Sequence, residues 1–510
     1  MIDKYYNGVI EQVYNHVGTT DRNIVMASYS NDFTIEDLET VKRYRQQEDS
    51  VFFASREFGY RELTGAYEPF LDTICDMFRK YGKGDFAAFM QECGVYELHR
   101  EILSSYYESG ICTRNENVLL NEVAYEQIRM TEAIASMLKA LAKEHPIVLV
   151  INRFQMASRS SFELVHELLE HPDKNIGLVL GVNDSVGRKE TVADVWDSIV
   201  ESIKDRSQLY HIGSSDRRRT AIAQEATLGD GYVDSVDVDE DYDASIRKVG
   251  NIVEFLDYDQ AKRYFREVES KIKFEDVQMK STSKRDFYLL YARTSILLGE
   301  LSKALELIAE AANLIPMEQE FLYRAQLDFL RGTCYMYQGK LDRAQKFADK
   351  AYMLAVESGD TLQVFRAQLL KVMAQMSGWY NIFFCVQDIP IEPELIEKLM
   401  HYDYKNHLAH IYIYAYDNQP NVVAKAYRSE SALFYFSKGV ALAKKIGNAQ
   451  LVYDAYQKNI MLASTNGMNE IALLYSVRTY EFMKSGENFY EGRMFSGIGY
   501  NLSAMGRNDM

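Results

Sequence analysis

The chain has 510 residues, of which 57 are Lys or Arg and 74 are Asp or Glu, giving a formal net charge of -17. A chain of this length is expected to form two or three domains. The acidic balance argues against an extended nucleic-acid surface, because binding to phosphates needs clustered Lys and Arg. No stretch reaches the roughly 18 apolar residues of a membrane span, and the N-terminus lacks the apolar core of a signal peptide.

The five cysteines are scattered and show no CxxC spacing. This pattern indicates neither a disulfide framework nor a zinc site, and it fits a reducing compartment. We therefore expect a cytoplasmic protein with no contact to membrane or nucleic acid in this segment.

Residues 1–215 alternate short apolar runs with amphipathic stretches of helical period. Strands are predicted at Asn23–Ala27, Val51–Ala54, Ile147–Ile151, Ile176–Val182 and Leu209–Ile212. Helices are predicted between them, including Ile35–Arg45, Pro69–Lys80, Asn121–Lys143 and Ser161–Glu170. Such alternation predicts an α/β domain with a parallel sheet that is covered by helices on both faces.

Two segments of this domain resemble a known family. They are GAYEPFLDTICDMF, from Gly65 to Phe78, and HPIVLVINRFQMASRSSFELVHELL, from His145 to Leu169. The first is similar to the segment after the second strand in the AAA-like ATPase core of bacterial STAND-type signalling proteins. The second is similar to that family's Walker B strand and the following helix. The resemblance covers roughly residues 20–185 and implies a P-loop NTPase fold, a nucleotide-dependent switch and a TPR array behind the ATPase core.

The P-loop that this resemblance implies is missing. It should follow the first strand at residues 28–37, with glycines for close approach to phosphates, a Lys, and a Ser or Thr for magnesium. No glycine occurs between Gly18 and Gly59, and the next lysine after the strand is Lys42. The degenerate loop offers Ser30, Asn31, Asp32 and Thr34 instead.

The residues around this loop are also acidic. Asp32, Glu36 and Asp37 place negative charge where a polyphosphate would lie. Like charges about 4 Å apart cost roughly 4 kcal/mol at an effective dielectric constant near 20. Thr34 and Asp37 are predicted to form a capping box, which would preserve the start of the following helix.

The Walker B position has changed in the same way. After the apolar run Ile147–Ile151, Asn152 stands where the family has its magnesium-binding acid, and Arg153 follows in place of a second acid. Asn is a weak magnesium ligand, and Arg repels the ion. We therefore predict a pseudo-NTPase domain with no catalytic residues, no cofactor and no metal.

Residues 216–250 are predicted to form an acidic linker. The run Asp230–Asp243 combines turn residues with like charges, which cannot build a core.

Residues 251–510 contain repeats of helical-hairpin type. In LLYARTSILLGELSKALELIAEAANLIP, Gly299 ends one helix, and Ala304 and Ala311 lie seven residues apart on the next. Forty residues later, Gly339, Ala344 and Ala351 repeat this pattern. Small residues at these offsets let two antiparallel helices approach closely, as in TPR hairpins, although the spacing exceeds the usual 34 residues. Further turns are predicted at Gly378, Gly467 and Gly506, and an earlier hairpin near Asn251 with Ala261 and Phe265.

The second domain is therefore expected to be an all-α TPR solenoid whose first helices line a concave face. Residues expected on that face are Arg293, Phe329, Thr333, Tyr337, Gln368, Gln375, Asp454 and Gln457. This aromatic and amide surface suits a protein or extended peptide, or a small effector. Packing between neighbouring repeats is the alternative role for Phe329 and Tyr337. The final residues read as the first helix and turn of a repeat, so we expect the natural protein to continue beyond Met510.

These features predict a non-catalytic sensory region of a bacterial signalling protein that controls an effector domain. The combination of this N-terminal region with TPR hairpins is similar to the regulatory regions of proteins that end in GGDEF diguanylate cyclase domains. Two alternatives remain at this stage. One is a STAND-type switch that still binds nucleotide, and the other is a LuxR-like transcription regulator without its DNA-binding domain.

Overall fold

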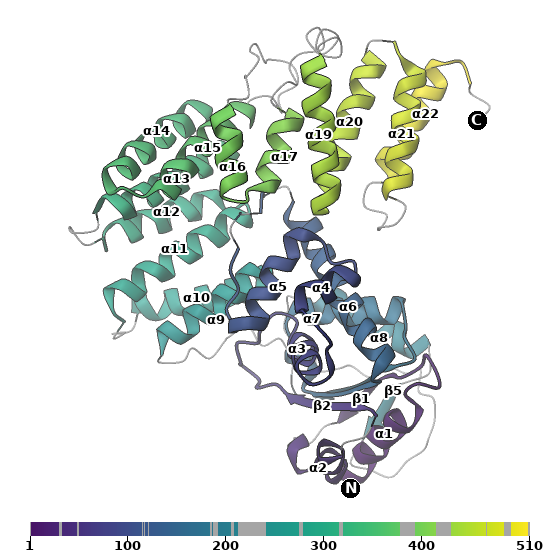
Figure 1. Cartoon of the computed structure of the whole chain (residues 1–510). Helices are drawn as coiled ribbons and strands as arrows, with labels where there is room; N and C mark the ends of the chain where they lie inside the picture. The colour runs from purple at the N-terminus through teal and green to yellow at the C-terminus, as the bar shows by residue number, and fades with distance from the viewer. Residues whose placement is uncertain are drawn as a thin grey trace. The chain divides into compact units, whose positions relative to one another are not determined.

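The computed structural model (Figure 1) describes most of the chain. The described residues are 2–29, 33–47, 50–114, 116, 118–120, 122–183, 186, 192–205, 209–212, 241–274, 279–315, 320–377, 393–414, 430–465, 467–483 and 491–507. They form two compact units, and each contains segments that are distant in sequence. Unit 1 comprises Met1–Val95, His99–Thr113 and Glu126–Ser283; unit 2 comprises Tyr96–Leu98, Arg114–Tyr125 and Lys284–Met510.

A parallel sheet of five strands lies at the centre of unit 1. Its strands are β1 (Ile24–Tyr29), β2 (Phe52–Glu57), β3 (Ile147–Asn152), β4 (Ile176–Asn183) and β5 (Leu209–Ile212). They lie in the order β2-β3-β4-β1-β5, and every adjacent pair is parallel. All five strands predicted from the apolar runs are confirmed. Every residue of β1, β3 and β4 is buried, and a strand buried on both faces is apolar along most of its length.

The two faces of the sheet bury different residues of the same strands. On one face, Val25, Ala27 and Tyr29 of β1 join a cluster with α1 (Ile2–His16) and α2 (Glu39–Gln46). On the other, Ile24 and Met26 of β1 join the larger core. This alternation follows from the two-residue period of a strand.

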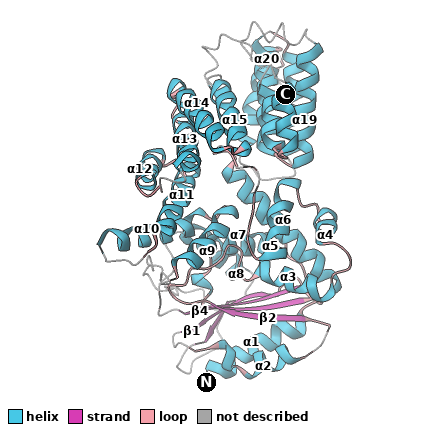
Figure 2. Cartoon of the chain, turned by 60° about the vertical axis from the view of Figure 1, so that its left-hand side comes forward, coloured by secondary structure: helices cyan, strands magenta, loops and turns pink. Residues whose placement is uncertain are grey.

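Helices cover both faces, as predicted (Figure 2). α1 and α2 lie on one face, and α3, α5, α6 and α7 lie on the other. The bounds of the remaining helices up to residue 205 are α3 Phe70–Tyr81, α4 Phe86–Glu92, α5 Glu97–Ser109, α6 Val123–Glu144, α7 Arg159–Glu170 and α8 Ala193–Asp205. Two short 3₁₀ turns, η1 (Ile35–Asp37) and η2 (Phe154–Met156), follow β1 and β3.

A helical hairpin belongs to unit 1 as well. It consists of α9 (Tyr242–Glu254) and α10 (Tyr258–Phe274), with Ala261 and Phe265 fully buried. Asp257, in the turn between them, accepts hydrogen bonds from the backbone N–H (3.1 Å) and the hydroxyl (2.7 Å) of Ser160 at the start of α7. The compact units therefore divide at Ser283, after this hairpin, whereas residues 213–240 of the expected acidic linker lie outside the described part of the chain.

Unit 2 is a succession of helices that pack on their neighbours in sequence, as a helical solenoid does. The bounds are α11 Ser281–Leu297, α12 Leu301–Ala312, α13 Glu320–Tyr337, α14 Leu341–Ser358, α15 Thr361–Ser377, α16 Pro393–His401, α17 Lys405–Tyr414, α19 Glu430–Ile446, α20 Ala449–Thr465, α21 Asn469–Met483 and α22 Glu491–Ala504. The chain therefore combines an α/β P-loop-like domain with an all-α TPR-like solenoid, as predicted.

The repeat register read from glycines and alanines agrees with the packing. Gly299, Gly339, Gly467 and Gly506 end helices in the left-handed backbone conformation that glycine adopts most easily. Ala304 and Ala344 are fully buried. The predicted turn at Gly378 lies outside the described residues.

The predicted helix Ile35–Arg45 is interrupted. The 3₁₀ turn η1 ends at Asp37, Leu38 is extended with ψ of 131°, and α2 begins only at Glu39. Ile35 and Leu38 are both buried against α1 and the sheet. The break allows both side chains to enter this layer of the core.

Candidate functional site

A buried polar cluster lies at the carboxyl ends of β1, β2 and β3, the edge at which open α/β sheets bind their ligands. Its central group is the carboxylate of Glu57, the last residue of β2. Glu57 Oε2 accepts a hydrogen bond from the backbone N–H of Ile35 at 2.8 Å. The segment after β1 thus directs a backbone donor at an anion, as a P-loop does, but the anion belongs to the protein itself.

Asn152 and Arg153 hold the same carboxylate. Asn152 Nδ2 lies 3.3 Å from Glu57 Oε2, and Arg153 Nη1 lies 3.1 Å from Glu57 Oε1. Both side chains of the ion pair are largely withdrawn from solvent, with 15% and 16% of their surfaces exposed. Asn152 and Arg153, at the end of β3, therefore stabilise a carboxylate of the neighbouring strand.

Asn152 is fully buried and makes several hydrogen bonds in this cluster. Its Oδ1 accepts a hydrogen bond from the hydroxyl of Tyr29 at 2.7 Å, and its Nδ2 also approaches the carbonyl of Phe33 at 3.4 Å. An amide supplies both a donor and an acceptor, which an ionised Asp cannot do.

Aromatic rings fill the space beside Asn152. Tyr6 of α1 is fully buried and makes edge contacts with Tyr29 and Phe33, at centroid distances of 6.3 and 5.0 Å. A Cβ atom added at Gly181 of β4 would lie 2.1 Å from the Tyr6 hydroxyl and 2.6 Å from Asn152 Oδ1. Glycine at 181 is thus required for the close approach of these groups to the sheet.

The predicted capping box at the start of the helix does not form. Thr34 makes no side-chain capping hydrogen bond, and the N–H of Asp37 donates to the backbone carbonyl of Thr34 at 3.1 Å instead. The α-helix itself starts only at Glu39. The other degenerate P-loop residues, Ser30, Asn31 and Asp32, lie outside the described part of the structure.

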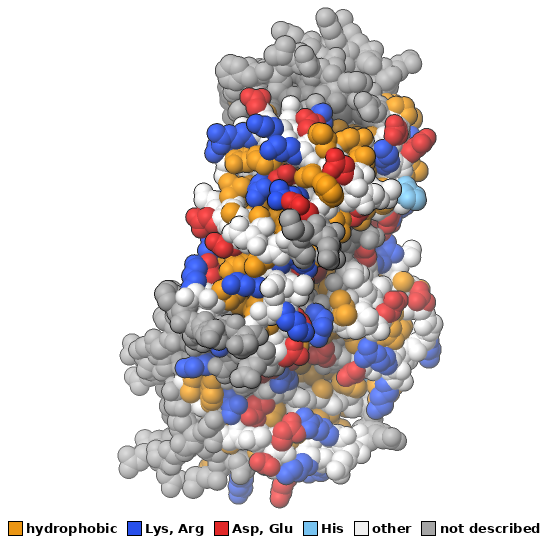
Figure 3. All heavy atoms as spheres, turned by 90° about the vertical axis from the view of Figure 1, so that its left-hand side faces the viewer, with side chains coloured by type: hydrophobic (Ala, Val, Ile, Leu, Met, Phe, Trp, Pro, Cys, Tyr) orange, Lys and Arg blue, Asp and Glu red, His pale blue; other side chains and the backbone are white. Residues whose placement is uncertain are grey.

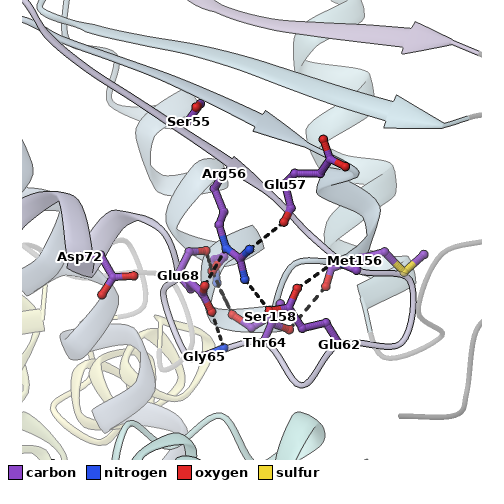
Figure 4. A network of polar contacts seen from close by, with 12 residues as sticks. Ser55, Arg56, Glu57, Glu62, Thr64, Gly65, Glu68, Asp72, Met156 and Ser158 are labelled. Carbon is purple, nitrogen blue, oxygen red and sulfur yellow. Dashed lines mark hydrogen bonds and ion pairs between the residues drawn. The ribbon is translucent and has the colours of Figure 1, made fainter. Parts of the chain in front are cut away.

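A second polar network holds the loop between β2 and α3 (Figure 4), where the GAYEPF resemblance lies. Arg56 pairs with Glu62 at 2.5 Å and with Glu68 at 2.7 Å. Each carboxylate also accepts a backbone N–H, from Gly59 and Gly65 respectively. Arg56 and Glu57 are neighbours in β2, so the two networks begin at adjacent residues of one strand.

A groove in unit 2 is the other candidate site. It holds a cavity of about 90 Å³, lined mainly by apolar side chains of α11, α13, α15 and α17. Four of the residues expected on the concave face line it: Arg293, Phe329, Thr333 and Tyr337. The sequence analysis did not identify Met336, Arg366, Tyr404 and His407, which line it too.

The remaining expected residues do not line this cavity. Gln368 Oε1 accepts a hydrogen bond from Lys398 of α16 at 3.0 Å, and Asp454 accepts one from Gln450 at 2.9 Å within α20. Gln457 is partly buried on α20, and the side chain of Gln375 lies outside the described structure. Whether any of these residues contacts a partner stays a prediction.

Residues from far upstream in the chain also line this groove. Val118 and Leu119 border the cavity, and the N–H of Leu120 donates to the Tyr337 hydroxyl at 3.2 Å. The apolar surroundings of this hydroxyl raise the pKa of Tyr337 to about 12. Tyr337 therefore contacts another segment of the chain within unit 2.

Two buried carboxylates flank these apolar residues. Glu116 accepts hydrogen bonds from the backbone N–H groups of Asn406 (2.8 Å) and His407 at the start of α17, and it lies 2.5 Å from His407 Nδ1. An anion is favoured at the N-terminus of a helix because its first N–H groups have no partner within the helix.

The second carboxylate, Glu122, is 1% exposed. It accepts hydrogen bonds from Asn406 Nδ2 (2.8 Å) and Asn448 Nδ2 (2.7 Å), and it lies 2.7 Å from His410 Nε2. Burial raises the pKa of the Glu122 carboxyl, but His410 and the two amides lower it by more, so the net shift is downward. His407 and His410 meet acids about 290 residues away in the sequence, and no local pattern around these histidines predicts the contacts.

Three further observations bear on the ligand class. On the face shown in Figure 3, described Lys and Arg side chains are interspersed with Asp and Glu and form no broad basic field. Within the described residues, no group of three or more His, Cys, Asp and Glu side chains is arranged to hold a metal ion. None of the helices in the described ranges is long and apolar enough to cross a membrane.

No family model and no curated protein matches the sequence. Among solved structures, the chain is similar to a Signal Transduction ATPase with Numerous Domains (STAND) protein with a tetratricopeptide repeat sensor from Pyrococcus horikoshii. The similarity has a TM-score of 0.40 and 11% sequence identity, and it covers 96% of this chain and 84% of the other.

Proposed function

We propose that this chain is a non-catalytic regulatory region of a signalling protein, with a pseudo-NTPase domain and a partner-binding helical solenoid. The observation that carries the proposal is the Glu57 carboxylate, which accepts the N–H of Ile35 and is held by Asn152 and Arg153. A polyphosphate placed beside this carboxylate would be repelled, and a magnesium ion would meet the Arg153 guanidinium.

The solenoid is the part that we expect to recognise a partner. Its groove combines apolar side chains with Arg293, Arg366 and Tyr337, and such a mixture gives both affinity and orientation to a bound ligand. Asn406 of α17 and Asn448, the residue before α20, already donate hydrogen bonds to buried carboxylates of the chain within unit 2. These features support a protein or peptide ligand for this unit.

The output that we propose is a separate effector domain outside residues 1–510. A GGDEF diguanylate cyclase is the effector implied by the resemblance of the sequence to the regulatory regions of such proteins. A DNA-binding domain of LuxR type is the alternative effector. The support for either one is the sequence resemblance alone.

Calorimetric titration of the purified chain with ATP and magnesium tests the pseudo-NTPase part. We expect no saturable heat, and no rise in melting temperature with 1 mM ATP. A site with a dissociation constant of 10 μM would stabilise the fold by about 2.7 kcal/mol at this ATP concentration. Micromolar affinity that is abolished by substituting Asn152 would overturn the proposal and favour a nucleotide-dependent switch.

A further inference from the structure

The segment Glu116–Glu122 has one acid at each end, with Val118, Leu119 and Leu120 between them. In sequence it lies between α5 and α6, but it packs as part of unit 2. Glu116 and Glu122 are 6% and 1% exposed, and Val118 and Leu119 are each 8% exposed. Buried carboxylates are rare unless they are paired, and here each one meets several donors of the solenoid.

We propose that the solenoid groove is a binding site for an extended peptide that has two acidic residues around an apolar core, and that Glu116–Glu122 occupies this site as an internal competitor. The proposal deepens the proposed function by naming the chemistry of the partner. The segment contacts two residues that line the groove, Tyr337 and His407, and three polar residues outside the cavity lining: Asn406, His410 and Asn448.

A peptide that takes the place of the internal segment needs an acidic residue at each of its two ends, because hydrogen-bond donors of unit 2 lie there. The N–H groups of Asn406 and His407 and the amide of Asn448 point to the carboxylates. A buried donor left without an acceptor costs about 1–3 kcal/mol. A peptide without these acids would therefore lose binding free energy of this order at each end of the site. The acids are six residues apart, which an extended chain spans in at most about 20 Å.

The apolar part of the groove is not filled by the internal segment. The cavity of about 90 Å³ is lined by Val118 and Leu119 of the segment and by Phe329, Met336 and Leu369 of the solenoid. Unfilled space forfeits dispersion contacts that a larger side chain would make. A partner with bulkier apolar residues between its acids therefore has room to bind more tightly than the segment.

The internal segment needs only weak intrinsic affinity to keep the groove occupied. A tethered segment acts at an effective concentration in the millimolar range. A partner therefore displaces it only if the partner binds more tightly or is present at a comparably high concentration. Displacement of residues 116–122 would release a stretch joined directly to α6, which begins at Val123. Because the segment is covalently joined to α6, displacement of the segment by a partner in unit 2 would change the start of a helix that continues into unit 1.

A fluorescently labelled peptide of residues 113–124, TRNENVLLNEVA, tests the proposal with the full chain. The opened variant carries Glu116→Gln and Glu122→Gln, which weaken the internal segment and leave the groove unchanged. The matched control carries Glu306→Gln and Glu310→Gln, two exposed positions on α12 of the same unit. We expect fluorescence anisotropy to show at least tenfold tighter binding to the opened variant than to wild type or control. A peptide with both acids changed to Gln should not bind.

A second opened variant, Leu119→Ala, weakens the internal segment in a different way and can be used if the first variant does not fold. Circular dichroism and melting temperature show which variants are folded. Failure of the peptide to bind folded opened variants, or equal binding to all chains, would refute the internal competitor. That result would leave the proposed pseudo-NTPase role standing, because the titration with ATP and magnesium measures it independently.

Discussion

The Oε2 atom of Glu57 lies 2.8 Å from the backbone nitrogen of Ile35, so the end of β2 supplies the anion that the segment after β1 receives. Arg153, after β3, completes the arrangement by pairing with the other carboxylate oxygen at 3.1 Å. The charges are thus reversed relative to a magnesium-binding site, with an acid near the loop and a cation after the third strand. Substitutions in this cluster should therefore change the free energy of unfolding in a direction that the charges predict.

Restoring the acid at Asn152 should destabilise the protein rather than restore magnesium binding. Asn152→Asp would place a carboxylate next to Glu57, now 3.3 Å from the Asn152 amide nitrogen, and would remove that donor. Loss of a partner in a buried charged cluster costs about 3–5 kcal/mol, and we expect a loss of this order in the free energy of unfolding. Urea denaturation with and without magnesium measures it.

The matched control for this change is Asn313→Asp, at the C-terminal end of α12 in unit 2, where the side chain is not fully buried. It should alter the free energy of unfolding by less than about 1 kcal/mol. A neutral Asn152→Asp variant, or one that magnesium strongly stabilises, would contradict the cluster described here.

Gly181→Ala should destabilise unit 1, and Tyr6→Phe should rescue it. The new Cβ would lie 2.1 Å from the Tyr6 hydroxyl, which is buried and has no hydrogen-bond partner among the described residues. Overpacking of this kind typically costs about 1–3 kcal/mol. Removing the hydroxyl relieves the shorter of the two contacts and leaves the 2.6 Å contact with Asn152, so the rescue should be partial.

A double-mutant cycle from chemical denaturation measures this coupling. Gly8→Ala is the control, because nothing lies within 4 Å of the added Cβ on α1. Alanine is favoured over glycine within a helix by up to about 1 kcal/mol, so this variant should be neutral or stabilised. Additive effects of Gly181→Ala and Tyr6→Phe would show that the hydroxyl is not the obstructing group.

Ala344→Leu should destabilise the solenoid, whereas Lys346→Leu on the same helix should not. Ala344 is fully buried on α14, and its carbonyl would lie 3.3 Å from a Cβ added at Gly332 of α13. Extra methylenes in this close helix contact should cost about 1–3 kcal/mol. Lys346 is exposed, so its replacement adds no volume to the core. Equal stability of the two variants would invalidate the hairpin register.

The stabilising effect of Glu122 should disappear in acid. The pKa of its carboxyl in the folded chain lies below the ordinary value of 4.5. A lowered folded pKa stabilises the protein above the unfolded pKa, and the contribution is lost as the pH falls through the folded pKa. The difference in unfolding free energy between wild type and Glu122→Gln should therefore be constant above about pH 5.5 and shrink below pH 4.5. A difference that is independent of pH down to pH 3 would argue against an ionised, paired Glu122.

The five strands, the helices after the second and third strands, and the turns at Gly299, Gly339, Gly467 and Gly506 followed from the sequence alone. An apolar run such as Ile147–Ile151 indicates a buried strand. A small residue such as Ala344 indicates a close contact between two helices that are neighbours in sequence. Both patterns are local, so the sequence shows them directly. The position of Asn152 and Arg153 at the end of β3 was likewise predicted, because it is set by the apolar run before them; that they replace Walker B acids stays a prediction.

Only the tertiary structure decided which distant groups meet. Glu57 and Ile35 are 22 residues apart, and Glu116 and His407 are 291 apart. No local pattern links such pairs, because their contact depends on how strands and helices are ordered in space. For the same reason His407 and His410 are the partners of two buried acids from a distant segment, which no local pattern around these histidines indicates.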